Sequence, residues 1–342
     1  MSDANYVRRI LLTIALIALA LAAWRLAGLL MLVFGGLLLA VVLRRLALLL
    51  GRLVRLPQPW PLYLLIAVLI GLIGGGLWMF GGQITGQAQA LQDTIGKAMS
   101  NFEDVLSERG MSGILSGVED MDWMASGMVS RLTGAASLAV EALYSVLVIA
   151  FVGLYVAVHP RVYQRGLLLL LPASRQTQAE RALAATGEAL WSWMVGQAIA
   201  MALVGVLTWG ALMVLGIPMA GTLAILAALL EFVPIVGPLI AAVPALLIAL
   251  TQGIDTMLWV ALAYLVIQSA ESYIITPLAE RWAVALPPGV AIVAITAFFS
   301  LFGFVGMLFA MPFAVAVTVM LRVLYVREAL GNTPSDDSKM PG

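Results

Sequence analysis

Long apolar stretches alternate with short polar gaps along the whole chain. A helix that crosses a bilayer needs about 20 mostly apolar residues, and charged residues should fall in the gaps between such helices. Before residue 216, apolar stretches cover about 10–24, 29–43, 62–80, 138–158 and 191–215. The first could be a signal peptide, but the second follows almost at once, which favours an uncleaved pair of short spans. Helical spacing at 174–190 predicts a helix that leads into the fifth stretch.

Two later apolar segments are interrupted in the middle. Residues 219–250 contain Pro234, Gly237 and Pro238, which remove backbone donors and favour a turn. Residues 289–325 repeat the arrangement with Gly303 and Gly306, followed by Pro312. The arms are short for a full crossing, which favours re-entrant hairpins, with kinked full spans as the alternative. With an unbroken span at about 256–275 between them, we expect an all-α polytopic membrane protein of about eight membrane segments.

A polar segment at 83–133 has an amphipathic pattern of its own. Apolar residues recur every three or four positions from Ile84 to Leu106, and less regularly up to Leu132. This pattern predicts a helical segment that lies on the membrane or on the protein itself, or one that contacts another subunit.

Composition excludes several function classes. Hydrophobic residues make up 63% of the 342 residues and charged ones 11%, too few to cover a water-facing surface. The chain has no cysteine and one histidine, so thiolate and multi-histidine metal sites are excluded. Patterns typical of nucleotide-driven pumps, zinc proteases and serine hydrolases do not occur. We therefore expect no enzyme, cofactor or metal centre, and the zero net charge gives no indication of nucleic-acid binding.

Charge distribution predicts the orientation in the membrane. Thirteen of the 18 Lys and Arg residues fall in the N-terminal tail, in two gaps near residues 44–55 and 161–181, or after residue 321. Cytoplasmic loops carry the excess of Lys and Arg, so both termini should be cytoplasmic and 83–133 should lie outside. The chain then divides into three spans (1–82), the outer segment (83–133), a fourth span with a linker helix (134–190), a core holding both broken segments (191–327) and a disordered tail (328–342).

Acidic and amide side chains inside apolar segments are the candidate site residues. Glu231 precedes the first break, and an intramembrane acid is costly unless it is wet, paired or bound to an ion. Gln268 lies one helical turn before Glu271 and shares its helix face, where the pair could bind a solute or an ion, or hold two helices together. Glu280 and Arg281 are adjacent and are either a gate or an ordinary loop pair.

Several spaced motifs between residues 160 and 325 carry a family resemblance. They are Trp193–Gln197, Leu215–Pro218, Phe232–Pro238 with Pro244, Gln268–Glu271 with Pro277, Leu286–Pro287, and Gly303, Gly306 and Pro312. In this order they resemble the autoinducer-2 exporter family of bacterial membrane proteins. The resemblance implies a homo-oligomeric transporter of the inner membrane that exports an autoinducer-2-like signal or exchanges sodium and protons.

Two functions compete on this reading. The first is a secondary transporter or facilitator for a small polar solute or monovalent cation, in which the hairpin-containing half moves and gives access to a site near Glu231, Gln268 and Glu271. The second is a non-transporting membrane scaffold organised by the outer segment.

Overall fold

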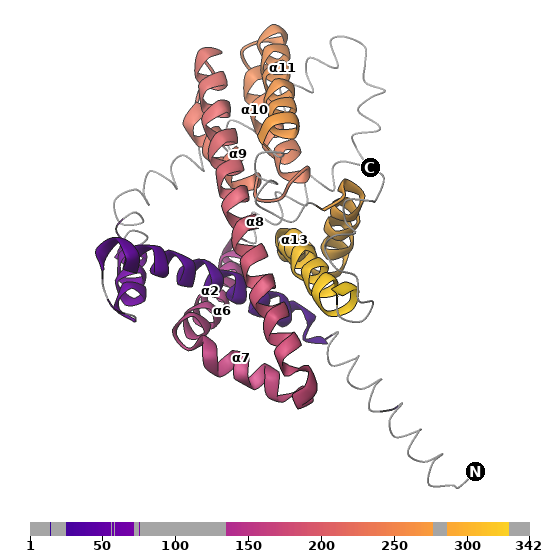
Figure 1. Ribbon diagram of the computed structural model, residues 1–342. Helices are drawn as coiled ribbons and strands as arrows, with labels where there is room; N and C mark the ends of the chain where they lie inside the picture. Colours follow the sequence, from indigo (N-terminus) through magenta and orange to yellow (C-terminus); the bar gives the residue numbers. More distant parts are fainter. Residues whose placement is uncertain are drawn as a thin grey trace, which may run out of the picture.

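Helices make up every regular element in the part of the chain that the structure describes (Figure 1). This computed structural model describes residues 25–71 except 56 and 58, residues 135–275 and 286–327, and the single residues 14 and 75. The all-α prediction is therefore confirmed. The labelled helices are α2 (Ala27–Val54), α6 (Ala135–Val158), α7 (Pro160–Leu169), α8 (Ala173–Val214), α9 (Ala220–Leu230), α10 (Val236–Leu250), α11 (Ile254–Ala270) and α13 (Pro288–Leu321), with single π-turn helices at η2 (Glu271–Ile275) and η3 (Arg322–Arg327).

Four stretches of helix among the described residues are long and apolar enough to cross a membrane. They are α2, α8, Ile254–Tyr273 and Pro288–Leu324. A fifth candidate joins α6 to α7, which are bent by 89°. Shorter apolar helices cover Trp60–Gly71, α9 and α10. The chain is a polytopic membrane protein, and the count of eight segments stays a prediction.

The longest helix, α8, joins the two halves of the molecule. Its 42 residues form one unbroken helix of about 63 Å, roughly twice the thickness of a hydrocarbon core. Figure 1 shows its N-terminal part beside α2 and α7 and its C-terminal part beside α9, α10 and α11. An ion pair of 2.6 Å between Arg45 and Glu188 ties α2 to its N-terminal part. The boundary predicted at residue 190 falls inside this helix, because no glycine turn or proline interrupts the helical spacing there.

The first broken segment is a helical hairpin. Leu223 near the start of α9 and Ile248 near the end of α10 lie in one buried cluster, so these ends of the two helices pack side by side. The ends of the hairpin also meet, because the Gln252 amide donates a hydrogen bond of 3.2 Å to the Gly216 carbonyl. The chain therefore reverses direction at residues 231–235.

The second broken segment also folds back on itself. Gly303 interrupts α13 with φ 62° and ψ −147°, a backbone conformation that only glycine adopts readily. The rings of Phe298 and Phe313 lie 5.0 Å apart, whereas a straight helix would separate these residues by roughly 22 Å. A Cβ on Gly306 would clash with the carbonyl of Phe298, so the close approach of the arms requires glycine there. The geometry matches a hairpin; its relation to the membrane faces stays a prediction.

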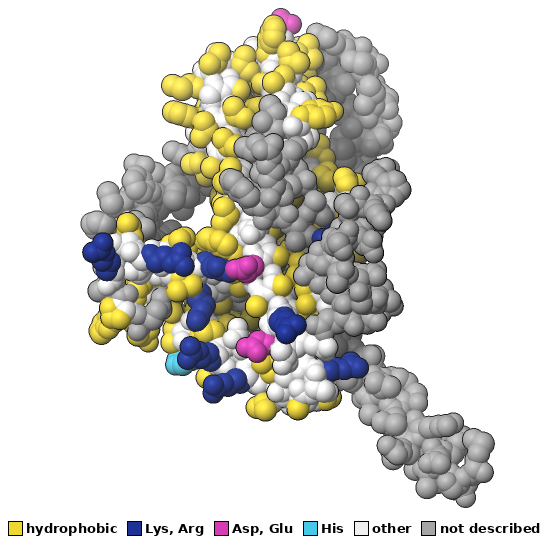
Figure 2. Space-filling model, in the orientation of Figure 1, with side chains coloured by type: hydrophobic (Ala, Val, Ile, Leu, Met, Phe, Trp, Pro, Cys, Tyr) yellow, Lys and Arg dark blue, Asp and Glu magenta, His cyan; other side chains and the backbone are white. Residues whose placement is uncertain are grey.

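Basic side chains gather at one end of the molecule. Exposed arginines lie at the C-terminal end of α2, on α7 and at the start of α8, and Figure 2 shows Lys and Arg over this lower half. The helix α2 is longer than the predicted span and includes Arg44, Arg45 and Arg52 in its last turns. Because positive residues stay on one side of a bilayer, this end is the predicted cytoplasmic side.

Some predictions concern residues outside the described part of the chain. These are the first span, the outer segment at 83–133, the Glu280–Arg281 pair and the tail at 328–342. The scaffold hypothesis depends on the outer segment and stays a prediction for the same reason.

Close packing of α2 against α6 provides a first test of the fold. A Cβ on Gly36 would lie 2.6 Å from the Cβ of Val152, so Gly36→Ala should push the two helices apart and destabilise the protein by about 1–3 kcal/mol. Thermal unfolding of the purified protein in detergent measures the effect. Gly28→Ala on the same helix meets nothing within 4 Å and should not lower the midpoint. Equal midpoints for the two variants would contradict this packing.

Candidate functional site

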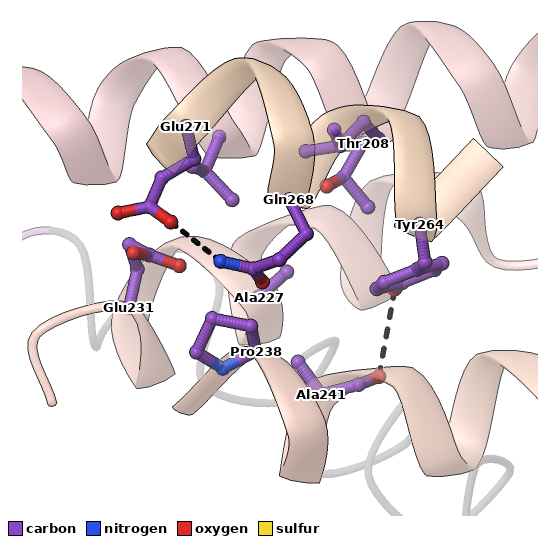
Figure 3. Close-up of a pocket in the computed structure, with 10 residues that line it drawn as sticks. Thr208, Ala227, Glu231, Pro238, Ala241, Tyr264, Gln268 and Glu271 are labelled. Atoms are coloured by element: carbon purple, nitrogen blue, oxygen red, sulfur yellow. Dashed lines mark hydrogen bonds between the residues drawn. The ribbon is translucent and has the colours of Figure 1, made fainter. Parts of the chain in front are cut away.

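Four helices converge on one buried cavity (Figure 3). Each of α8, α9, α10 and α11 contributes at least one residue, and the first hairpin contributes its turn. The lining residues are Val204, Thr208, Ala227, Glu231, Pro238, Ala241, Tyr264, Ile267, Gln268 and Glu271. The cavity thus brings together Glu231, Gln268 and Glu271, which come from two distant parts of the sequence.

The cavity is small and largely enclosed. The space that the centre of a water molecule can occupy inside it has a volume of about 10 Å³. That is about the space one water molecule requires. In this conformation the site has room for a water molecule or a small ion, and none for an organic molecule of several carbon atoms.

Glu231 is the most deeply placed charged residue of the site. It caps the C-terminal end of α9, and only 1% of its surface is exposed. Its backbone carbonyl accepts a hydrogen bond of 2.6 Å from the Gln197 amide of α8. Its side-chain oxygen Oε2 is buried and has no hydrogen-bond partner among the described residues. The structure holds the backbone of this residue firmly and leaves a carboxylate oxygen facing the cavity.

Gln268 and Glu271 face Glu231 from the other side of the cavity (Figure 3). The Gln268 amide donates a hydrogen bond of 2.5 Å to Oε2 of Glu271, and the Ser272 hydroxyl lies 3.5 Å from the same oxygen. The carboxyl groups of Glu231 and Glu271 point toward each other in Figure 3, and two like charges placed in this way would repel each other. No lysine, arginine or histidine is among the lining residues, so no basic side chain that lines the cavity balances the Glu231 carboxylate.

Proline and glycine shape the hairpin turn beside Glu231. Val236 donates a backbone hydrogen bond of 2.9 Å to the Pro234 carbonyl, which closes a γ-turn around Ile235. Ile235 has φ 72°, a strained conformation for a β-branched residue. A Cβ on Gly237 would clash with the Leu230 carbonyl, so the two arms can approach only with glycine there. Pro238 lies in the first turn of α10, where its missing N–H breaks no helical bond.

The turn of the first hairpin packs between α8 and the second hairpin. The rings of Phe232 and Trp193 meet edge to face at 5.7 Å. Val233 lies in a buried cluster with Ile295 and Met307, one from each arm of the second hairpin. Movement of either hairpin therefore has to disturb the other.

Two residues that line the cavity were not predicted. Thr208 and Tyr264 line the cavity, but polar residues within apolar spans gave no signal that separated them from ordinary helix positions. Pro312 lies buried inside the second arm of α13 and not at the break, which Gly303 makes. Glu280 and Arg281 lie outside the described residues, so their predicted gate role stays a prediction.

These features define a polytopic helical membrane protein with a buried acidic cavity beside a broken helix. Residues 12–325 match the protein family described as "AI-2E family transporter", and the chain belongs to that family. It is 28% identical over 179 residues to "Putative transport protein YrrI" of Bacillus subtilis (strain 168), an alignment that covers 52% of this chain and 50% of the relative. It is 24% identical over 156 residues to "Putative transport protein YueF" of the same organism, covering 45% and 42%. The chain spans about half the length of the curated relatives it matches.

Gln197 offers a test of how the hairpin turn is held. Gln197→Leu leaves the Glu231 carbonyl without its donor in a partly buried place, which should destabilise the protein by about 1–3 kcal/mol. The shift of the thermal midpoint in detergent measures this effect. Gln252→Leu removes a side-chain bond to a carbonyl at the exposed end of the same hairpin, where water can replace it, and should have a smaller effect. A larger loss for Gln252→Leu would contradict the proposed anchoring.

Proposed function

We propose that this protein is a secondary transporter or facilitator of the bacterial inner membrane that moves a monovalent cation in exchange for protons. Glu231, Gln268 and Glu271 are the proposed binding residues. Membership of a transporter family supports the transport function. The observation that carries the choice of substrate is the small enclosed cavity, whose described lining residues include two carboxyl groups and no basic side chain.

The size of the cavity favours an ion over a larger solute. Pockets that bind drug-sized organic ligands have volumes of about 300–1,000 Å³. The cavity here is the size of one water molecule, so an autoinducer-2-like signal would require a large movement of the hairpin before it could bind. Divalent cations fit less well, because calcium takes six to eight oxygen ligands and magnesium usually keeps several water molecules.

A proton and a cation compete for the same oxygens in this proposal. Two close carboxylates repel each other, so in this proposal Glu231 binds a proton or shares a cation with Glu271. Release of a proton to one side leaves negative charge in the cavity, and that charge attracts a cation from the side then open. Movement of the hairpin-containing half against the rest of the protein changes which side is open.

The proposal includes no nucleotide-driven step and no enzymatic reaction. We propose that both termini lie in the cytoplasm, on the side of the arginines. We also propose that the protein is a homo-oligomer in the lipid bilayer. These points follow the charge pattern and the family resemblance, and the cavity does not depend on them.

Sodium flux into liposomes that contain the purified protein tests the two acids. Glu231→Gln and Glu271→Gln should each lower the flux at least about tenfold, because each removes a charge that balances the ion in a poorly solvated place. In the wild type, protons compete with sodium, so a lower pH should raise the sodium concentration that gives half-maximal flux. The variants that still transport should lose this dependence.

Asp255→Asn is the matched control for these variants. Asp255 is an exposed acid on the same helix as Gln268, so its loss should leave flux and pH dependence unchanged. Unchanged transport by both glutamine variants would remove the acids from the mechanism. Flux of autoinducer-2 in place of sodium would show that the site opens far more widely than proposed.

A further inference from the structure

We propose that Thr208 is a ligand of the transported cation and lets the site distinguish a cation from a proton. The inference rests on the function proposed above and adds a residue and a chemical step to it. In that step the ion loses its water shell and binds a hydroxyl oxygen from α8 together with the acids.

The Thr208 hydroxyl is a buried polar group that lacks a partner. Thr208 is 0% exposed, and its Oγ1 has no hydrogen-bond partner among the described residues. A buried hydroxyl without a partner is destabilising by about 1–3 kcal/mol. Such a group in a packed helix bundle requires an explanation, and a bound ion or water is one.

Two other hydroxyl side chains in the apolar helices that the structure describes do have partners. The Ser269 hydroxyl donates a hydrogen bond of 2.7 Å to the Leu265 carbonyl one turn earlier, and Ser300 donates one of 2.9 Å to the Thr296 carbonyl. This bond to the preceding turn is the usual arrangement for Ser and Thr in helices. Thr208 does not form it, although the backbone of α8 is regular at this position, and the residue lines the cavity instead (Figure 3).

Acidic and amide oxygens complete the proposed set of ligands. Oε2 of Glu231 is the second buried atom of the cavity without a partner. Because Gln268 uses its amide nitrogen to bind Glu271, its carbonyl oxygen remains an acceptor. The ligands then come from three places: α8, the hairpin turn and α11. All are oxygens, which small hard cations prefer.

The hydroxyl matters for a cation and not for a proton. A proton binds to one carboxyl oxygen and needs no second ligand. Among the described lining residues, the titratable ones are Glu231, Glu271 and Tyr264, so Thr208 itself is not a proton-binding group. A cation in a cavity this small has lost most of its water, so each protein oxygen replaces one of its ligands. The oxygen of Thr208 offers lone pairs for this purpose, and the methyl group of valine has none.

Thr208→Val separates the two cases, because valine has nearly the same shape and no hydroxyl. In liposomes at a fixed pH, Thr208→Val should raise the sodium concentration for half-maximal flux about five- to tenfold, as expected for one lost polar contact. The competition by protons should persist, because both acids remain. Thr208→Ser keeps the oxygen and should stay within about twofold of the wild type.

Thr186→Val is the matched control. Thr186 also lies on α8 and also has a buried hydroxyl without a partner among the described residues, but it does not line the cavity. Its replacement should leave the half-maximal sodium concentration unchanged. An effect equal to that of Thr208→Val would overturn the inference, and so would an equal loss in Thr208→Ser, which would indicate packing and not coordination.

A binding measurement keeps this inference separate from the proposed function. Sodium that binds only the folded state raises the thermal midpoint in detergent, and potassium, a larger ion, should raise it less. The sodium-dependent rise should shrink in Thr208→Val and persist in Thr208→Ser. The role of Thr208 alone would be overturned if Thr208→Val showed a normal sodium-dependent rise of the thermal midpoint and normal sodium flux while the Glu231→Gln protein was inactive. A wild type with neither sodium flux nor a sodium-dependent rise would overturn both proposals.

Discussion

Burial of the Glu231 carboxyl group is the constraint on which the rest of the site depends. An ionised carboxylate is strongly destabilised in an apolar interior unless a positive charge or several hydrogen bonds compensate it. The described residues that line this cavity include no basic side chain, and they include a second acid, Glu271. In the proposed mechanism the group therefore binds a proton or a cation whenever the cavity is closed. Exchange of the bound proton or cation then requires that the cavity open to water.

The broken helix makes this burial possible. In a continuous helix, the backbone groups around Glu231 would form hydrogen bonds within the helix. The direction of its side chain would then be set by the helix face on which it lies. The turn at 231–235 instead places the carboxyl group at the meeting point of α8, α10 and α11, while Gln197 satisfies its backbone carbonyl. The tight turn requires a strained backbone conformation at Ile235. A strained residue of this kind persists only where the surrounding packing holds it.

Most of the architecture could be predicted from sequence because its causes are local. Pro234, Gly237 and Gly303 mark the two turns, since each limits or frees the backbone whatever surrounds it. Glu231 stood out because acids are rare in apolar segments. Thr208 could not be predicted, because a threonine in a helix usually bonds its own preceding turn, and only the tertiary structure shows that it does not. The part of Pro312 in the second break stays a prediction, since this proline lies buried inside the second arm of α13.

The origin of the cavity's residues suggests how binding and movement are linked. Thr208 belongs to α8, which runs the length of the molecule and is tied to α2 through Glu188. Glu231 belongs to the hairpin turn, and Gln268 and Glu271 to α11 and the π-turn after it. An ion bound by all of them is held only while the hairpin, α8 and α11 stay together. Any separation of the hairpin from α8 divides the ligands, lowers the affinity and admits water in the same movement. In the proposed mechanism, opening of the cavity and release of the ion are then one event, and no separate trigger is needed to free the ion.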